Sequence, residues 1–250
     1  MGALVKIGLQ LNKVLHHFGV QLARSPSGPE WRRTRLMAAK GITAVIDVGA
    51  NEGQYGRRLR QLGYGGSIYS YEPLPAAFAR LRERSQSDQR WRAFNLAVGD
   101  AAGRVNLNVA ANSESSSILA ITRSHLDAEP RSETVASVEV EVTTLDDIVK
   151  DLPPQPTMLK IDTQGYEDRV LAGGMGMLHR VHLLEVELSL FEVYSGQRLF
   201  RDMDARILAA GFELVSLAEG FFDRHTGQLL QVDAIYARRE AATSESRASR

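Results

Sequence analysis

The spacing of hydrophobic residues along the chain changes near residue 44. Over residues 3–23, apolar side chains recur every three or four positions with basic and polar residues between them, which predicts an amphipathic helix. Proline, glycine and serine at 24–29 then break the chain, and a second short helix is predicted over 30–39. We therefore expect residues 1–40 to form a helical extension.

From residue 44 onward, short apolar runs that are typical of buried strands alternate with helical patterns. The predicted strands cover residues 44–49, 67–72, 91–98, 105–109, 135–143, 157–162, 181–188, 212–217 and 230–237. The predicted helices cover residues 53–62, 75–84, 145–149, a stretch beginning at 166, and 199–210. Such alternation indicates a mainly parallel sheet with helices on both faces. We expect a single Rossmann-like α/β domain over 41–238 and a frayed polar tail over 239–250.

Composition narrows the classes of function. Lysine plus arginine and aspartate plus glutamate number 30 each, so the strongly cationic surface of a nucleic-acid-binding protein is not expected. The chain has no cysteine, which excludes disulfides and thiolate metal sites. No apolar run approaches the roughly 20 residues of a transmembrane helix, and the N-terminus does not resemble a signal peptide. These features predict a soluble, cytoplasmic protein.

The strongest local signal is the glycine-containing turn that follows the first predicted strand. It reads Gly-x-Asn-x-Gly from Gly49 to Gly53, not the Gly-x-Gly-x-x-Gly of dinucleotide sites, and no Gly-Lys-Ser/Thr follows it. A diphosphate requires a positive helix N-terminus. Asp47, two residues before the turn, can lie beneath it and orient the loop or a cationic ligand group. Together with Glu52 it flanks the turn, which favours a ligand with sulfonium and ammonium groups.

Three further carboxylates are predicted at strand ends along the same crevice. Glu72 ends the second strand, 25 residues after Asp47, where an acidic side chain can accept hydrogen bonds from both hydroxyls of a ribose. Asp162 ends a later strand and is placed to act as a general base or a metal ligand for an alcohol substrate. With Glu187 at the next strand end, it would suit Mg²⁺. Alternatively, Asp162 orients the cofactor and Glu187 pairs with an arginine.

Nine segments of the chain together resemble the FkbM-type methyltransferases. They are residues 45–55, 71–73, 95–99, 144–147, 160–167, 170–173, 184–189, 194–197 and 231–234. The resemblance covers about residues 44–238, and its motifs occur in order at compatible separations. The first 40 residues take no part in it.

This resemblance implies a class I methyltransferase fold, with a seven-stranded, mainly parallel sheet and an antiparallel last strand. It also implies S-adenosylmethionine as cofactor and O-methylation of a hydroxyl, on a sugar of a glycolipid, polysaccharide or glycosylated metabolite. Leu74 and Val98 would enclose the adenine ring, and Glu72 would hold the ribose. The implied cofactor-binding residues are Asp47, Gly49, Asn51, Gly53, Tyr55, Glu72, Asn95, Ala97, Val98 and Asp162.

The sequence leaves several candidates for the general base and for the residues that contact the acceptor. Asp162, His225 and His125 are candidates for the general base, and 115–117 and Tyr194 are candidate acceptor contacts. The N-terminal helix would pack on its own domain, join two subunits in a homodimer, or lie at a membrane surface near a lipid-linked substrate.

Two other classes of function compete with the methyltransferase. An NAD(P)- or nucleotide-sugar-dependent Rossmann enzyme would carry Gly-x-Gly-x-x-Gly and a Tyr-x-x-x-Lys pair, and we find neither. A non-catalytic module that binds a partner through its N-terminal helix would not require carboxylates at positions 47, 72 and 162 of the crevice. The sequence therefore favours the methyltransferase.

Overall fold

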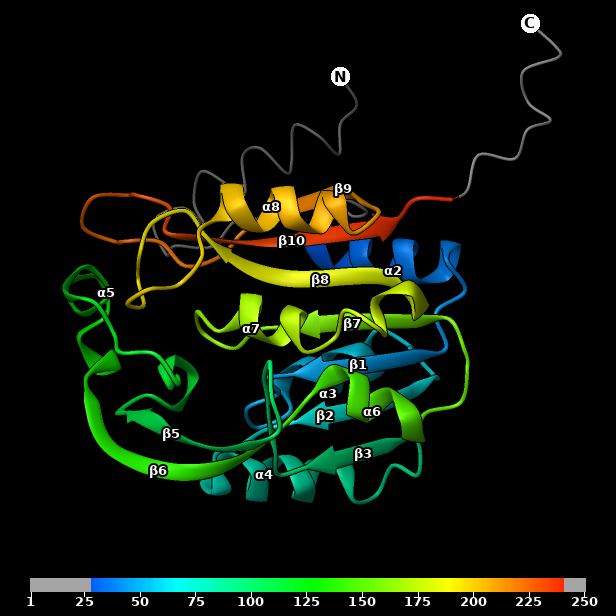
Figure 1. The fold of residues 1–250 in the computed structure, drawn as a ribbon, viewed down its shortest axis with the longest axis horizontal. Helices are drawn as coiled ribbons and strands as arrows, with labels where there is room; N and C mark the ends of the chain where they lie inside the picture. The colour runs from blue at the N-terminus through cyan, green and yellow to red at the C-terminus, as the bar shows by residue number, and fades with distance from the viewer. Residues whose placement is uncertain (1–27, 241–250) are drawn as a thin grey trace, which may run out of the picture.

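The computed structural model describes residues 28–240 (Figure 1). The helix predicted over 3–23 and nearly all of the predicted tail lie outside the described residues. The α-helices are α2 (Pro29–Ala39), α3 (Gln54–Gln61), α4 (Pro75–Ser85), α5 (Arg123–Ala128), α6 (Leu145–Ile148), α7 (Glu167–Ala172) and α8 (Phe200–Ala209). The strands are β1 (Ala44–Val48), β2 (Ser67–Tyr71), β3 (Trp91–Phe94), β4 (Ala97–Val98), β5 (Gly103–Ala110), β6 (Thr134–Thr143), β7 (Thr157–Ile161), β8 (Val181–Ser189), β9 (Phe212–Glu219) and β10 (Gln231–Arg238).

The central sheet has seven strands in the order β3-β2-β1-β7-β8-β10-β9. β1 pairs in parallel with β2 and β7, whereas β10 is antiparallel to both β8 and β9. The last strand of the chain thus lies between the two that precede it. This order confirms the predicted class I methyltransferase fold.

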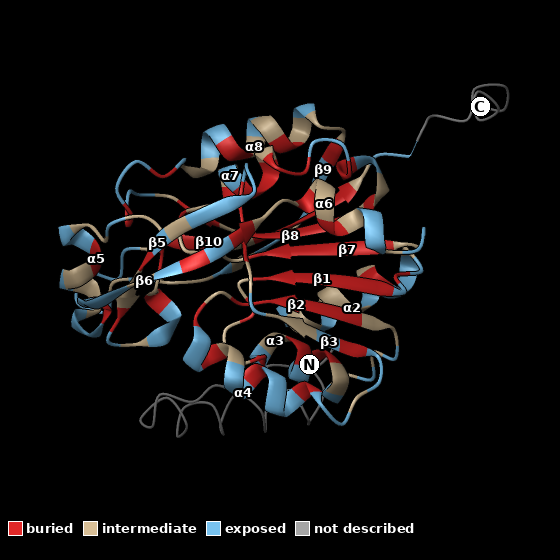
Figure 2. Ribbon diagram, turned by 60° about the horizontal axis from the view of Figure 1, so that its bottom comes forward, coloured by how far each residue is buried: buried red, intermediate tan, exposed pale blue. Residues whose placement is uncertain are grey.

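Helices cover both faces of the sheet because alternate residues of its strands point in opposite directions. Ile46 of β1 packs in one hydrophobic cluster with residues of α6, α7 and α8. Its neighbour Val45 packs in the other cluster, with residues of α2, α3 and α4. Figure 2 shows the central strands β1 and β7 as buried throughout, as expected for a parallel sheet between two helical layers.

The predicted C-terminal end of the third strand is wrong. The strand predicted over 91–98 ends at Phe94, and Ala97–Val98 forms β4 in a separate sheet of order β4-β6-β5. The side-chain amide of Asn95 donates to the carbonyl oxygens of Glu72 and Pro73, at 2.9 Å each, which turns the chain between the two strands. Figure 1 places the small sheet and α5 at the carboxyl ends of the parallel strands.

Helix α2 packs onto the main sheet although it falls within the predicted N-terminal extension. Met37 is buried in the same cluster as α3 and α4, and Arg33 donates to the carboxylate of Glu185 in β8 at 2.7 Å. Arg32 donates to Ser216 in β9 at 3.2 Å. Among residues 28–240, no helix is both long and apolar enough to cross a bilayer.

Candidate functional site

A cavity of about 790 Å³ opens at the carboxyl ends of β1, β2 and β7, beneath the small sheet. Most of the predicted site residues line it, as does Leu74. The lining residues among those predicted are Gly49, Asn51, Tyr55, Glu72, Ala97, Val98, Asp162 and Glu187. The predicted residues outside this lining are Asp47, Gly53, Asn95 and His225.

The turn between β1 and α3 requires its glycines. Gly49 has φ +75°, and a Cβ atom there would lie 1.8 Å from the backbone carbonyl oxygen of Asp162 in the adjoining strand end. Gly53 has φ +85°, and its Cβ would lie 2.9 Å from the side chain of Leu81. Neither position accepts a side chain, and Gly49, which lines the cavity, therefore presents only backbone atoms to it.

Replacing Gly49 with alanine is expected to lower the free energy of unfolding by about 3 kcal/mol or more, measured by urea denaturation. The added methyl group must displace a backbone carbonyl, in addition to the cost of a left-handed alanine. Gly63→Ala is the matched control, because Gly63 has φ +87° and nothing within 4 Å of its Cβ. That control isolates the backbone cost, about 1–2 kcal/mol. Equal losses in the two variants would contradict the close approach at Gly49.

Glu72 lies at the end of β2 with its carboxylate held by two backbone groups. Oε2 accepts the N–H of Asn51 at 2.8 Å, and Oε1 accepts the N–H of Leu74 at 2.8 Å. Burial raises the pKa of Glu72 to about 7, against these two donors, which favour the ionised form. Each oxygen keeps a second lone pair, so the carboxylate can still accept hydroxyl donors from a ligand in the cavity.

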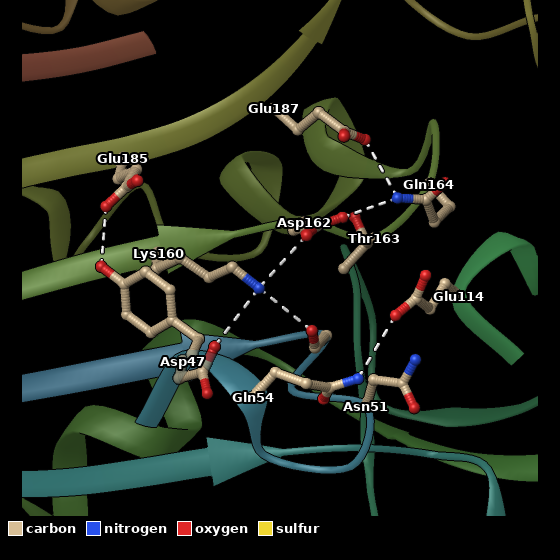
Figure 3. A network of polar contacts seen from close by, with 12 residues as sticks. Asp47, Asn51, Gln54, Glu114, Lys160, Asp162, Thr163, Gln164, Glu185 and Glu187 are labelled. Carbon is tan, nitrogen blue, oxygen red and sulfur yellow. Dashed lines mark hydrogen bonds and ion pairs between the residues drawn. The ribbon is translucent and has the colours of Figure 1, made fainter. Parts of the chain in front are cut away.

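Lys160 in β7 connects three groups beneath the cavity (Figure 3). Its Nζ lies 3.3 Å from Asp47 Oδ1 and 3.4 Å from Asp162 Oδ2, and it donates to the carbonyl oxygen of Gly49 at 3.1 Å. Burial disfavours its charge, but Asp162 and Asp47 outweigh that cost and raise the pKa of Lys160. Lys160 therefore stays charged and holds β1 and β7 together at the turn.

The two acidic residues that flank the turn are already paired within the protein. Glu52 accepts hydrogen bonds from Arg84 at 2.9 Å and from Arg80, both in α4. Asp47 is fully buried and pairs with Lys160. The acidic flank that favoured a cationic ligand in the sequence is thus neutralised, and Asp47 orients the loop instead of facing the cavity.

A tight turn follows β7 and is held by one buried carboxylate. Glu167 Oε1 accepts the N–H of Thr163 at 2.8 Å, the Thr163 hydroxyl at 3.1 Å and the N–H of Gly165 at 3.1 Å. Burial raises the pKa of Glu167 to about 7. The folded protein consequently binds more protons here than the unfolded chain between about pH 4.5 and pH 7.

Stability should depend on pH through Glu167. Because the pKa of Glu167 is raised in the folded state, its contribution to the free energy of unfolding is fully present below pH 4.5 and is lost as the pH rises through 7. The Glu167→Gln variant has no such proton, so its unfolding free energy relative to wild type should increase by roughly 1–3 kcal/mol between pH 5 and pH 8. Urea denaturation at several pH values measures this difference. The control is Glu213→Gln, at an exposed position of β9, which should not reproduce this difference from wild type.

Asp162 and Glu187 are brought together as predicted, but they do not fit a shared cation. The side-chain nitrogen of Gln164 lies between them and donates to Asp162 Oδ1 at 2.7 Å and to Glu187 Oε2 at 3.0 Å (Figure 3). An amide donor therefore stands where a bridging metal would be. Among residues 28–240, no group of three or more histidine, aspartate or glutamate side chains is arranged to hold a metal. The Mg²⁺ prediction has no support from this geometry.

The two loop histidines lie in different surroundings. His125 is buried at the cavity wall, where its Nε2 lies 3.0 Å from the hydroxyl of Ser132, which in turn lies 2.9 Å from the hydroxyl of Ser115. His225 is exposed on the β9–β10 loop, and its backbone N–H donates to Asp223. His225 as general base stays a prediction, while His125 and the 115–117 serines do line the cavity.

No role was predicted from the sequence for three residues that lie at the site. Lys160 interrupts an otherwise apolar strand, a pattern that marks a buried charge with partners. Arg33 reaches the cavity from α2, where its guanidinium stacks 5.0 Å above Tyr55 while the Tyr55 hydroxyl donates to Glu185 at 2.7 Å. Gln164 lies within the 160–167 segment of the family resemblance, but no role was predicted for it. Its role depends on contacts with distant segments.

The chain is similar to known proteins in two comparisons of sequence. Residues 47–214 match the family model described as "Methyltransferase FkbM domain". The chain is also 28% identical over 226 residues to the 2-O-methyltransferase NoeI of Sinorhizobium fredii (strain NBRC 101917 / NGR234), covering 86% of this chain and 92% of that protein.

Solved structures are more distant. An rRNA methylase from Streptococcus thermophilus aligns with 87% of this chain and 100% of its own, at 10% identity and a TM-score of 0.47. The METTL16 methyltransferase domain covers 92% of this chain and 79% of its own, at 9% identity and a TM-score of 0.48. At these values the structural likeness carries no argument about substrate, and the fold assignment rests on the strand order.

Proposed function

The chain belongs to the FkbM methyltransferase family, and on that premise we propose that it transfers the methyl group of S-adenosylmethionine to a hydroxyl oxygen of a sugar. The acceptor would be part of a glycolipid, a polysaccharide or a glycosylated metabolite. One observation carries the proposal. A single cavity has a carboxylate and apolar walls suited to an adenosine at one end, and a polar wall suited to a hydroxylated acceptor at the other.

The cofactor end of the cavity fits the shape and chemistry of S-adenosylmethionine. Glu72 would accept the two ribose hydroxyls, and Leu74 and Val98 supply apolar walls for the adenine ring. The bare backbone at Gly49 leaves room for the methionine portion to approach. When bound, S-adenosylmethionine supplies an electrophilic methyl group on sulfur. The residues of this chain orient it.

The acceptor end is formed by the insertion between β4 and β7. Its wall includes Asn112 and residues 113–117, joined by Gln231 of β10, and these offer hydroxyl, amide and carboxylate groups. Such groups suit a neutral acceptor with several hydroxyls. The name of the relative NoeI, a 2-O-methyltransferase, supports an oxygen acceptor for this chain as well.

Of the two predicted catalytic residues, Asp162 is the one that lies at the cavity. It directly follows β7, lines the cavity and pairs with Lys160, which suits it to orient the cofactor and the incoming hydroxyl. Most of the rate of a methyl transfer can come from such positioning, since the step is an in-line displacement. His225 would have to reach the cavity from its exposed loop.

Calorimetry with S-adenosylhomocysteine, followed by transfer assays, tests the proposal. We expect micromolar binding of S-adenosylhomocysteine and no binding of NAD⁺. With tritiated S-adenosylmethionine, we expect label to appear in a methyl ether on at least one of a panel of methyl glycosides of hexoses and 6-deoxyhexoses. Cofactor binding without transfer to any hydroxyl compound would reject O-methylation. Binding of NAD⁺ alone would favour the dinucleotide-dependent enzyme.

A further inference from the structure

Gln164 adopts a backbone conformation that glutamine rarely takes. Its φ is +57°, and Asn51, with φ +46°, is the only other non-glycine residue with positive φ among residues 28–240. Both residues line the cavity. Strained residues persist where surrounding contacts enforce them, and they gather at functional sites. The positive φ of Asn51 belongs to the glycine turn between β1 and α3. The positive φ of Gln164 lies outside that turn and has a different cause.

Four hydrogen bonds hold Gln164 in this conformation. Its side-chain nitrogen donates to Asp162 at 2.7 Å and to Glu187 at 3.0 Å. Its side-chain oxygen accepts the hydroxyl of Tyr194 at 2.7 Å, and its backbone carbonyl accepts the hydroxyl of Ser117 at 2.7 Å. Tyr194 and Ser117 are both fully buried, so these partners hold the glutamine firmly.

The Tyr194 hydroxyl lies 2.7 Å from Gln164 Oε1 and 3.1 Å from the carbonyl oxygen of Ser115, and the shorter contact favours one orientation of the amide. A phenol that donates to the amide oxygen turns the NH₂ group toward the two carboxylates. Burial and the neighbouring Asp162 raise the pKa of Glu187, and an amide that offers one N–H to each of the two side chains favours their ionised forms without adding a net charge. Gln164 therefore keeps Asp162 and Glu187 together at the acceptor end of the cavity.

This arrangement leaves one oxygen of Glu187 available. Gln164 and Gln231 both donate to Oε2, the latter at 2.8 Å, whereas Oε1 has no hydrogen-bond partner among the described residues. Glu187 lines the cavity, and no arginine or lysine is hydrogen-bonded to it within residues 28–240. An oxygen in this position suits a hydroxyl donor of the acceptor.

We propose that Gln164 is a positioning residue for methyl transfer, which holds Asp162 and Glu187 side by side and leaves Glu187 Oε1 to receive the acceptor hydroxyl. This inference rests on the proposed O-methyltransferase function. In the transfer, the hydroxyl oxygen forms a bond to the methyl carbon while the carbon–sulfur bond breaks and its electron pair stays on sulfur. The hydroxyl proton leaves along its hydrogen bond to the carboxylate. Gln164 touches no reacting atom.

Two variants separate positioning from stability. Gln164→Gly and Gln164→Ala both remove the amide, but only alanine retains the strain of a positive φ. We expect kcat to fall about a hundredfold in both, because displaced carboxylates misalign the hydroxyl. The melting temperature of the glycine variant should exceed that of the alanine variant by about 2–4 °C. The S-adenosylhomocysteine Kd should change much less than kcat, by at most about tenfold in both, since Gln164 would affect the cofactor only through Asp162.

Tyr194→Phe adds a milder test, and Gln89→Ala is the matched control. The phenylalanine keeps the buried ring and removes the hydroxyl that orients the amide, so kcat should fall about tenfold at an unchanged S-adenosylhomocysteine Kd. Gln89 is exposed at the opposite end of the sheet, and its replacement should leave kcat unchanged. Rates are measured with the methyl glycoside that the wild-type protein methylates fastest.

The results for these variants distinguish failure of the positioning role from failure of the proposed O-methyltransferase function. Activity that follows the melting temperature across the variants, or wild-type kcat in Gln164→Gly, would overturn the positioning role while O-methylation stands. Loss of S-adenosylhomocysteine binding in these variants would also overturn it, by placing Gln164 at the cofactor. If the wild-type protein binds S-adenosylhomocysteine but methylates no hydroxyl compound, the proposed function fails and the inference fails with it.

Discussion

Replacing Glu72 with alanine is expected to weaken S-adenosylhomocysteine binding by about a hundredfold or more, as measured by calorimetry. Glu72 is only 5% exposed, and it lines the cavity directly after β2, where the proposed function places the ribose of the cofactor. Its removal takes away the acceptor for two ligand hydroxyls. It also leaves the N–H groups of Asn51 and Leu74 without their partner, which loosens the turn around the cofactor.

The glutamine variant makes this prediction more specific. Both oxygens of Glu72 accept a backbone N–H, so an amide would have to point its NH₂ group at another donor. We therefore expect Glu72→Gln to lose affinity as well, although it preserves the side-chain shape. Glu83→Ala, on the exposed face of α4, is the control and should bind like wild type. Full affinity in a folded Glu72→Ala protein would remove the ribose assignment.

Replacing Lys160 with methionine is expected to destabilise the folded protein strongly. Its ammonium group pairs with Asp47 and Asp162, and Asp47 has no exposed surface. Removal of one partner from a buried ion pair costs about 3–5 kcal/mol, because the remaining charge is left without compensation. For a chain of this length, that corresponds to a drop in melting temperature of roughly 6–20 °C. Thermal unfolding monitored by circular dichroism measures the change.

A second substitution tests whether charge is the cause. In Lys160→Met/Asp47→Asn, the buried carboxylate is removed together with its cation, so we expect about half of the lost stability to return. Lys150→Met is the control, because the Lys150–Asp147 pair is exposed and such pairs contribute at most about 1 kcal/mol. If the double variant were no more stable than Lys160→Met, packing of the lysine side chain would matter more than its charge.

The functional site was predictable where it depends on strand ends and on short sequence motifs. Glu72 and Asp162 each follow an apolar strand, and the carboxyl ends of parallel strands meet along one edge of the sheet. Their convergence on one cavity follows from the strand pattern. The limits of the strands were less predictable, because the turn after Phe94 depends on hydrogen bonds from Asn95 to a segment more than 20 residues earlier.

The roles of these residues inside the site depend on tertiary contacts that no local sequence pattern predicts. Asp47 was predicted to lie beneath the turn and to orient either the loop or a cationic ligand group, and its pairing there with Lys160 from a neighbouring strand favours the loop. Asp162 and Glu187 were predicted to share a cation, but the amide nitrogen of Gln164 lies between them and donates to both, while its oxygen lies against the hydroxyl of Tyr194, 30 residues later. Side-chain partners of this kind depend on packing between distant segments.

The sequence by itself determined the order of strands and helices, the bare glycine turn and the carboxylates at the strand ends. Each of these follows from periodicity or from the backbone freedom of one residue type. The tertiary structure alone decided which charges are paired, how Arg33 of α2 joins the cavity wall and which oxygen of Glu187 stays available. These properties depend on distances between segments far apart in the chain, and burial makes the free energy of each contact depend on all of its neighbours.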